Sequence, residues 1–158
     1  MEFCRMQKPD FPALLKPGIH SLTIEALYGL AVAPFPKDSR RAELYEKLKL
    51  WVTTLRSSGV RGRLWLDGSF LTEKMGPSDI DCIFWSPSWV DEKNATQQVK
   101  AEVGKLLDRA YAETIFSLDF YMETPAPDRV LHREAYWRGM LGFCHDRVTA
   151  KGFAEITL

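Results

Sequence analysis

Two apolar runs near the middle of the chain are separated by a short polar connection, and this arrangement most constrains the fold. The first run, RLWL at residues 63–66, leads into Gly68 and Ser69, and the second run covers residues 80–85. Apolar runs of this length that are bounded by turn residues are typical of buried strands. We therefore expect two consecutive strands, joined by the segment that begins with Gly68 and Ser69.

Helical and strand patterns on both sides of this pair complete the predicted fold. Apolar residues recur at helical spacing over residues 21–33, 39–57, 94–111 and 129–141. β-rich runs cover residues 114–122 and 152–158, and the proline-rich residues 1–20 form an extended lead-in. This order predicts an α/β (α+β) fold, in which a mixed β-sheet is flanked by helices within one domain of residues 1–158.

The composition is that of a soluble globular protein. Hydrophobic residues make up 46% of the 158 residues, and 21 basic side chains balance 21 acidic ones. A chain of this length buries an ordinary core without disulfides or a structural metal. The neutral charge argues against strong non-specific binding to nucleic acid.

The cysteines and the N-terminus bear on the compartment. Cys4, Cys82 and Cys144 are scattered and odd in number, which favours a reducing environment over a disulfide framework. The first residues carry charge throughout, and the sequence has no apolar stretch of membrane-spanning length. We therefore expect a cytoplasmic protein with no membrane contact.

Three aspartates stand at positions where a buried strand is expected. Asp79 and Asp81 are two residues apart, so in a strand they project from one face while Ile80 and Cys82 project from the other. Two neighbouring carboxylates repel each other unless a cation lies between them, and hard oxygen ligands suit Mg²⁺ or Mn²⁺. Asp119 lies within the run SLDFY and would join them if its strand is adjacent.

The connection between the first two strands predicts a phosphate-binding turn. Gly68 allows the backbone to approach a ligand closely, and a short helix starting at Ser69 would point free amide groups at an anion. Lys74 lies in the same connection and can reach a terminal phosphate. Phosphate donors beside metal-binding acids describe a site for a nucleoside triphosphate (NTP).

The combination of Gly68-Ser69, Asp79-Ile80-Asp81 and the later Asp119 resembles the signature of the nucleotidyltransferase fold superfamily, the polymerase-β-like enzymes. Residues 65–82 and 136–158 are also similar to small uncharacterised bacterial proteins of that fold. The resemblance spans residues 63–122. It implies that Gly68, Ser69 and Lys74 bind the triphosphate, and that Asp79 and Asp81 ligate two metal ions. It also implies that Asp119 completes the metal site and helps activate the acceptor hydroxyl.

By this resemblance the protein is expected to be a Mg²⁺-dependent enzyme that transfers a nucleoside monophosphate from an NTP to a hydroxyl of a protein, an RNA end or a small molecule. The alternative is a non-catalytic module that binds an NTP or a partner protein from the same operon, as in a toxin-antitoxin or phage-defence pair. Minimal nucleotidyltransferase antitoxins usually carry arginines after Gly-Ser, where this chain has the residues FLTEK. The chain also leaves no room for a template-gripping domain, so templated synthesis is not expected.

Each candidate residue also has a purely structural interpretation. Asp79 can cap a strand or helix after a turn, and Asp81 and Asp119 can each form a buried salt bridge with an arginine. For Asp67 a role in the turn is favoured over a place in the site, and Lys74 can be a solvated surface lysine.

The remaining polar and aromatic residues are not assigned to chemistry. Arg129, Arg133 and Arg138 recur along one predicted helix, and a solvated helix face is favoured over a basic strip for RNA or a nucleotide. Core packing is favoured over base stacking for the tryptophans, except Trp89, for which both roles stay open. No metal site is expected from the isolated histidines, which are His20, His132 and His145.

Overall fold

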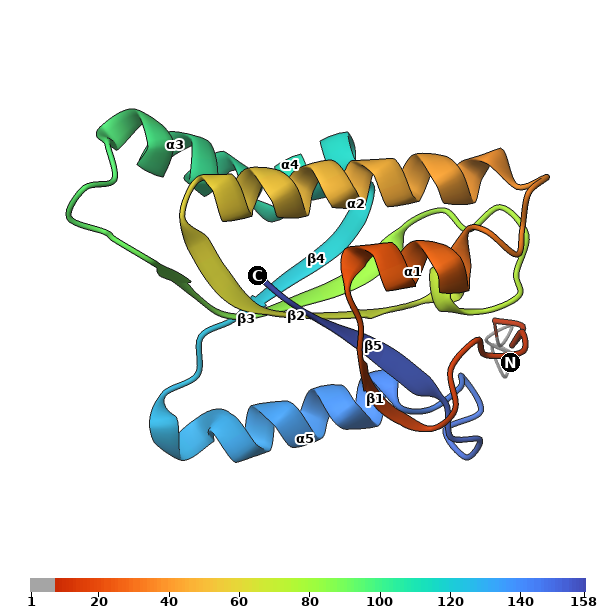
Figure 1. The fold of residues 1–158 in the computed structure, drawn as a ribbon. Helices are drawn as coiled ribbons and strands as arrows, with labels where there is room; N and C mark the ends of the chain where they lie inside the picture. Colours follow the sequence, from red (N-terminus) through yellow and green to blue (C-terminus); the bar gives the residue numbers. More distant parts are fainter. Residues whose placement is uncertain (1–7) are drawn as a thin grey trace, which may run out of the picture.

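The computed structural model describes residues 8–158, and its fold is a five-stranded sheet with helices on both faces (Figure 1). The strands and helices follow one another as β1 (Gly18–Ser21), α1 (Ile24–Ala31), α2 (Ser39–Ser57), β2 (Val60–Asp67), β3 (Ile80–Trp89), α3 (Gln97–Leu106), α4 (Arg109–Phe116), β4 (Leu118–Glu123), α5 (Val130–Leu141) and β5 (Gly152–Thr157). Single 3₁₀ turns, Ser69–Leu71 and Pro127–Arg129, precede β3 and α5. The predicted α/β (α+β) class with a mixed sheet is confirmed.

The sheet has the strand order β1-β5-β2-β3-β4. The outer pairs, β1 with β5 and β3 with β4, are parallel, whereas β2 is antiparallel to both β5 and β3. The expected strands 63–66 and 80–85 are therefore direct neighbours, and the strand that carries Asp119 lies beside the strand that carries Asp81.

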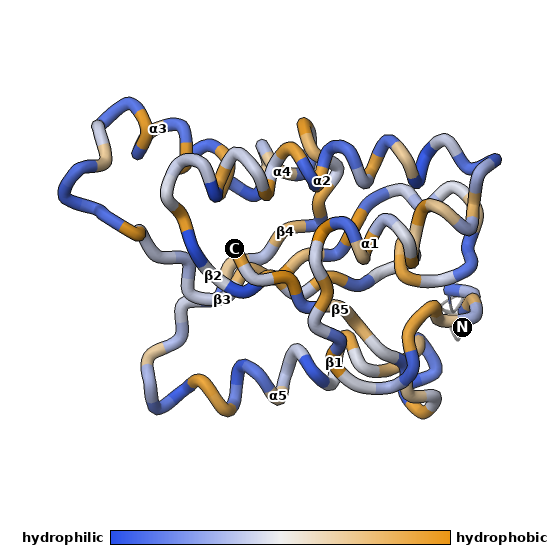
Figure 2. The backbone as a smooth tube through the Cα atoms, viewed as in Figure 1, coloured by the Kyte–Doolittle hydropathy of each residue, from blue (hydrophilic) through white to orange (hydrophobic). Residues whose placement is uncertain are grey.

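One face of the sheet packs against α1, α2, α3 and α4, which all lie on the upper side in Figure 1. The strands contribute alternate residues to this core, among them Leu64, Cys82 and Phe120. Trp51 of α2 is fully buried, and its indole nitrogen donates a hydrogen bond to the carbonyl of Leu106 at 2.9 Å. Truncation of a tryptophan in such a position costs about 3–5 kcal/mol of stability. Figure 2 shows hydrophobic and hydrophilic residues alternating along α2, as expected for a helix that turns one face to the core.

The opposite face is covered in part by α5. Trp65, Ile83 and Trp85 project from the strands and pack with Trp137 and Leu141 of α5. Four of the five tryptophans are thus buried in the two cores, and Trp89 is half-buried at the edge of the larger one, as expected from the sequence. Side chains alternate between the two faces along a strand, so Asp81 projects from the same face as Ile83 and Trp85. This is the face that α5 covers.

The predicted elements differ from the observed ones at several boundaries. The region 94–111 was expected to be one helix, but it forms α3 and α4, because the carboxylate of Asp108 accepts a hydrogen bond from the amide of Tyr111 and starts a second helix. The strand predicted over 114–122 begins at Leu118, since Thr114 still belongs to α4 and Ser117 ends that helix in a left-handed conformation. The N-cap of α2 is Asp38, whose carboxylate accepts a hydrogen bond from the amide of Arg41.

The extended lead-in predicted for residues 1–20 contains the short strand β1, which hydrogen-bonds to the C-terminal strand. Residues 1–7 of that lead-in, including Cys4, lie outside the described residues. Cys82 and Cys144 are free, which agrees with the absence of a disulfide framework expected for these two. Within residues 8–158, no helix is both long and apolar enough to cross a bilayer.

Candidate active site

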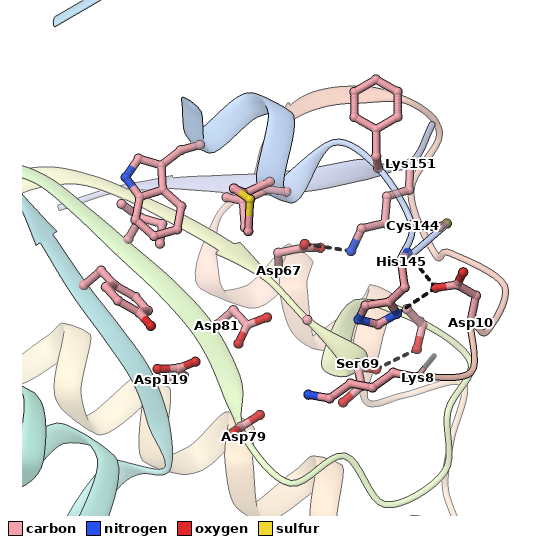
Figure 3. A pocket seen from close by; sticks show the side chains of 18 of the residues that line it. Lys8, Asp10, Asp67, Ser69, Asp79, Asp81, Asp119, Cys144, His145 and Lys151 are labelled. Atoms are coloured by element: carbon pink, nitrogen blue, oxygen red, sulfur yellow. Dashed lines mark hydrogen bonds and ion pairs between the residues drawn. The ribbon is translucent and has the colours of Figure 1, made fainter. Parts of the chain in front are cut away.

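Three aspartates form a row across neighbouring strands on the sheet face under α5. Asp81 of β3 is in register with Asp67, the last residue of β2, and with Asp119 of β4. Adjacent strands lie about 4.7–4.9 Å apart, so the three side chains leave the sheet side by side. Figure 3 shows Asp81 between the other two, with Asp79 at the start of the same strand. We call Asp67, Asp81 and Asp119 the acid row.

Asp81 occupies the centre of this concentration of negative charge. Burial and, after it, the negative charges of Asp79 and Asp119 together raise the pKa of Asp81 to about 6, against a smaller opposing effect of Lys151 and Lys8. Among residues 8–158, no cation lies within ion-pair distance of its carboxylate. The predicted parity is confirmed, since Ile80 and Cys82 point into the core on the other face. The fold therefore leaves Asp81 with negative neighbours and no cation in direct contact.

Asp119 has the arginine partner that the structural interpretation foresaw. The guanidinium of Arg109 donates a hydrogen bond to Asp119 at 3.1 Å and another to the hydroxyl of Tyr121 at 2.8 Å. The pair is not buried, because the side chains of Asp119 and Arg109 are 37% and 55% exposed. Solvent-exposed ion pairs of this kind contribute only about 0–1 kcal/mol, so Arg109 is a weak competitor for a stronger cation.

Gly68, the first residue of the connection between β2 and β3, lies in close contact with Asp81. Its φ is +89°, and a Cβ atom at this position would lie 2.7 Å from Oδ2 of Asp81. Only glycine combines this backbone conformation with such a close approach. The glycine therefore allows the turn and the acid to be neighbours, which the sequence alone indicated only as backbone freedom.

Ser69 begins a 3₁₀ turn, where a short helix was expected. The turn covers only Ser69–Leu71 and closes with a hydrogen bond from the amide of Thr72 to the carbonyl of Ser69 at 3.2 Å. Lys74 follows on the same connection, is half-buried and lines the cavity with Ser69. The structure thus brings together Gly68, Ser69 and Lys74 with the acids, as the sequence predicted for the candidate site.

A buried arginine holds this connection in place. Arg41 of α2 is fully buried, and its guanidinium donates to the carbonyls of Phe70 at 2.7 Å and Lys74 at 2.7 Å, and also to the carbonyl of Thr72. Its charge is balanced by Asp38, 3.4 Å away. Because carbonyl oxygens of the connection converge on one cation, the backbone around the turn is fixed from inside the protein.

Asp67 and Lys151 form a largely buried pair that the sequence did not predict. For Asp67 the sequence favoured a role in the turn, and nothing in it pointed to Lys151. Asp67 does not serve the turn as expected, since it is buried beside Asp81 and accepts a hydrogen bond from the ammonium of Lys151 at 2.7 Å. Burial raises the pKa of Asp67 to about 7, with Lys151 acting in the opposite direction. The other oxygen of Asp67 has no partner within residues 8–158. The two residues are 84 positions apart, so no local pattern could have paired them.

The segment before β1 lies across one side of the site and was not foreseen either. Asp10 accepts hydrogen bonds from the backbone amide and from the ring Nδ1 of His145, at 3.0 and 2.8 Å. Lys8 lines the same cavity, and in Figure 3 its ammonium extends toward the space between Ser69 and Asp79. Lys8 therefore adds a positive charge where a triphosphate was expected.

One cavity of about 760 Å³ between the sheet, α5 and residues 8–11 is bordered by the acid row, Asp79, Gly68, Ser69, Lys74, Lys8, Asp10, His145 and Lys151. The basic strip considered for α5 is not free, because Arg133 pairs with Glu123 and Arg138 lies 4.0 Å from Glu134. His20 and His132 are not part of the cavity lining. The cavity is therefore the place where the chain concentrates its candidate residues.

The suitability of the cavity for Mg²⁺ rests on the chemistry of its donors. In the described part of the chain, no group of three or more His, Cys, Asp or Glu side chains is already gathered as a metal site. Asp79 and Asp81 nevertheless offer hard oxygen atoms, and the pKa of Asp81 is raised by burial and, after it, by like charges that a divalent cation would relieve. Asp119 would have to exchange Arg109 for the metal.

The chain was compared with known proteins. No curated protein and no solved structure matches it. Residues 9–157 match a protein family described as a family of unknown function, DUF6932. The match covers nearly the whole chain, including the turn at Gly68, the acid row and Lys151. This protein therefore belongs to the DUF6932 family.

Proposed function

We propose that this protein is a Mg²⁺-dependent nucleotidyltransferase, which moves a nucleoside monophosphate from an NTP to an acceptor hydroxyl and releases pyrophosphate. One observation carries the proposal: Asp81 of β3 lies against Gly68 and is in register with Asp119 of β4, and Asp79 comes immediately before β3. Acids that could hold a metal beside a turn that could contact phosphate would suit NTP chemistry, and this supports the proposal.

In the proposed reaction, the oxygen of the acceptor hydroxyl forms a bond to the α-phosphorus of the NTP. The bond between the α-phosphorus and the oxygen that bridges to the β-phosphate breaks, and pyrophosphate leaves with that electron pair. The hydroxyl proton passes to a carboxylate of the acid row, for which the family resemblance favours Asp119. Bound Mg²⁺ would lower the pKa of the acceptor hydroxyl and neutralise the charge that develops on pyrophosphate.

The residues of the chain bind and orient the substrate in this scheme. Asp79 and Asp81 would hold the metal, while Ser69, Lys74 and Lys8 would contact the β- and γ-phosphates. Arg41 fixes the backbone of the turn through its hydrogen bonds to carbonyls. These contacts would align the α-phosphate with the acid row before the acceptor enters.

A second candidate function is a non-catalytic module that binds an NTP or a partner protein. The observation that favours it is the internal neutralisation of two of the acids, Asp119 by Arg109 and Asp67 by Lys151. A module of this kind would bind an NTP or a partner protein and transfer nothing.

Label transfer separates the two functions. The protein is incubated with each α-³²P-labelled NTP, Mg²⁺ and the protein, RNA or small-molecule fraction of a cell extract, and labelled products are separated. The proposal expects an α-labelled product that requires Mg²⁺ and is lost in Asp81→Asn but kept in the control Glu46→Gln, an exposed acid of α2. Metal-dependent NTP binding without any labelled product would favour the module, and activity retained in Asp81→Asn would refute the assignment of the site.

A further inference from the structure

The cavity has two chemically different ends, separated by the acid row. The strand register gives their order, because Ser69 follows Asp67 on one side of the row while Ile83 and Tyr121 stand in the next position on the other side. On that far side stands Tyr121 from β4, whose ring packs against Trp137 of α5, and Tyr136 and Met140 of α5 line the same cavity. We call these four residues the aromatic end.

The aromatic end is a fixed surface. The indole nitrogen of Trp137 donates to the carboxylate of Glu123 at 2.7 Å, and the ring of Trp137 packs against that of Tyr121 with centroids 5.2 Å apart. Arg133 donates to the same Glu123 oxygen at 3.0 Å, so the charge of Glu123 is balanced. Arg109 and Arg133 lie over one face of the Tyr121 and Tyr136 rings, at 4.1 and 4.7 Å, and each arginine is paired with a carboxylate. A pre-organised aromatic wall whose charges are balanced in this way suits a flat, uncharged ligand.

Two side chains of the aromatic end are exposed to solvent although they are large and mainly apolar. Tyr136 is 49% exposed and Met140 is 39% exposed, although both line a concave surface. Exposed apolar side chains that gather in a cavity with a few polar groups mark ligand sites. Leu131 of the same helix is 77% exposed but does not line the cavity, so it offers a matched control.

The direction of phosphoryl transfer decides what the aromatic end would hold. The attacking and leaving oxygens lie roughly in line across the transferred phosphorus. If pyrophosphate leaves toward the turn at Ser69, the attacking hydroxyl comes from the other side of the acid row, which is where Tyr121 and Trp137 stand.

We infer that the aromatic end binds the acceptor, and that the acceptor is a small molecule with a hydroxyl group on a flat, largely apolar body. This inference rests on the proposed function. Of the three acceptor classes, which are a protein, an RNA end and a small molecule, it selects the small molecule. The whole cavity of about 760 Å³, which includes the end assigned to the NTP, lies within the range of small-molecule sites, about 300–1,000 Å³. A nucleobase in the same place is the competing occupant.

The probe for this inference is 2-naphthol, titrated calorimetrically into the full-length protein in parallel with MgATP. We expect saturable 1:1 binding of 2-naphthol that weakens about fivefold in Tyr136→Ala, the loss typical of one aromatic contact. Met140→Ser should weaken it as well, whereas Leu131→Ala and Asp79→Asn/Asp81→Asn should not. Tyr136→Ala should leave the affinity for MgATP unchanged.

Three results would overturn the inference. The first is no saturable binding of 2-naphthol, or an affinity for 2-naphthol that is unchanged in both Tyr136→Ala and Met140→Ser while circular dichroism shows that the variants are folded. The second is weaker MgATP binding in Tyr136→Ala, which would place the nucleobase at the aromatic end. The third is binding of 2-naphthol by a protein that binds no NTP with Mg²⁺. In that third case the proposed function itself fails, whereas in the first two cases it survives.

Discussion

The substitution Gly68→Ala tests the close approach between the turn and Asp81. The added Cβ would lie 2.7 Å from Oδ2 and 3.0 Å from Cγ of Asp81, and the residue would have to keep a φ of +89°. A backbone conformation restricted to glycine costs about 1–3 kcal/mol for another residue. The steric contact adds a cost of similar size, about 1–3 kcal/mol, because either Asp81 or the turn has to move.

A double-mutant cycle separates these two costs. Asp81→Ala removes the two side-chain atoms that the new Cβ would clash with and leaves only the backbone nitrogen of Asp81 at 3.4 Å, so Gly68→Ala should cost about 1–3 kcal/mol less in that background than in the wild type. The free energies of unfolding are measured by urea denaturation of the four proteins. In a chain of this length 1 kcal/mol corresponds to about 2–4 °C, so the contact itself should lower the melting temperature by about 2–12 °C.

Gly59→Ala is the matched control, because Gly59 has a φ of +84° but nothing within 4 Å of the new Cβ. It should destabilise the protein by the same amount whether or not Asp81 is present. The reasoning is refuted if Gly68→Ala costs the same in the wild-type and Asp81→Ala backgrounds, since the turn would then not press on the acid.

Three further substitutions test the charges around the site. Arg41→Met should destabilise the protein by about 3–5 kcal/mol in urea denaturation, because it leaves Asp38 and several carbonyls buried without their cation. A loss of stability below about 1 kcal/mol would refute the role of Arg41 in holding the connection after β2. The folded protein holds the proton of Asp81 more tightly than the unfolded chain, so this group's contribution to stability falls as the pH rises from 3.8 through about 6. Asp81→Asn should therefore stabilise the protein by on the order of 2–3 kcal/mol at pH 8 and not at pH 3, and equal effects at both pH values would contradict this account. Lys151→Met should cost about 3–5 kcal/mol at pH 8 and less at pH 5, where Asp67 with its pKa of about 7 can protonate, and it should cost little in an Asp67→Asn background.

Local chemistry made part of this site predictable. The spacing of Asp79 and Asp81 determines that they share a face of any strand, and the core on the other face at Ile80 and Cys82 confirms it. The positions of Gly68 and Ser69 at the end of an apolar run likewise indicated the turn. These predictions succeeded because each depends on residues close together in the sequence.

The remainder depends on contacts between distant segments. Lys151 reaches Asp67 only because β5 pairs with β2, and α5 covers the acid face only because the chain crosses the sheet after β4. The break between α3 and α4 depends on one capping residue, Asp108, within an otherwise continuous helical pattern. Periodicity does not resolve such a break, because both helices keep an apolar stripe toward the same core.

The central claim is that Asp79 and Asp81 hold a divalent metal on which NTP binding depends. Isothermal titration with each of the four NTPs, with and without Mg²⁺, tests it most directly in the wild type and in Asp79→Asn/Asp81→Asn. The charge-matched control is Glu46→Gln/Glu102→Gln, which neutralises two exposed acids on α2 and α3. The account predicts binding of at least one NTP that requires Mg²⁺, is lost in the aspartate variant and persists in the control. Binding that is indifferent to Mg²⁺ or to loss of both aspartates, or no binding of any NTP, would contradict it.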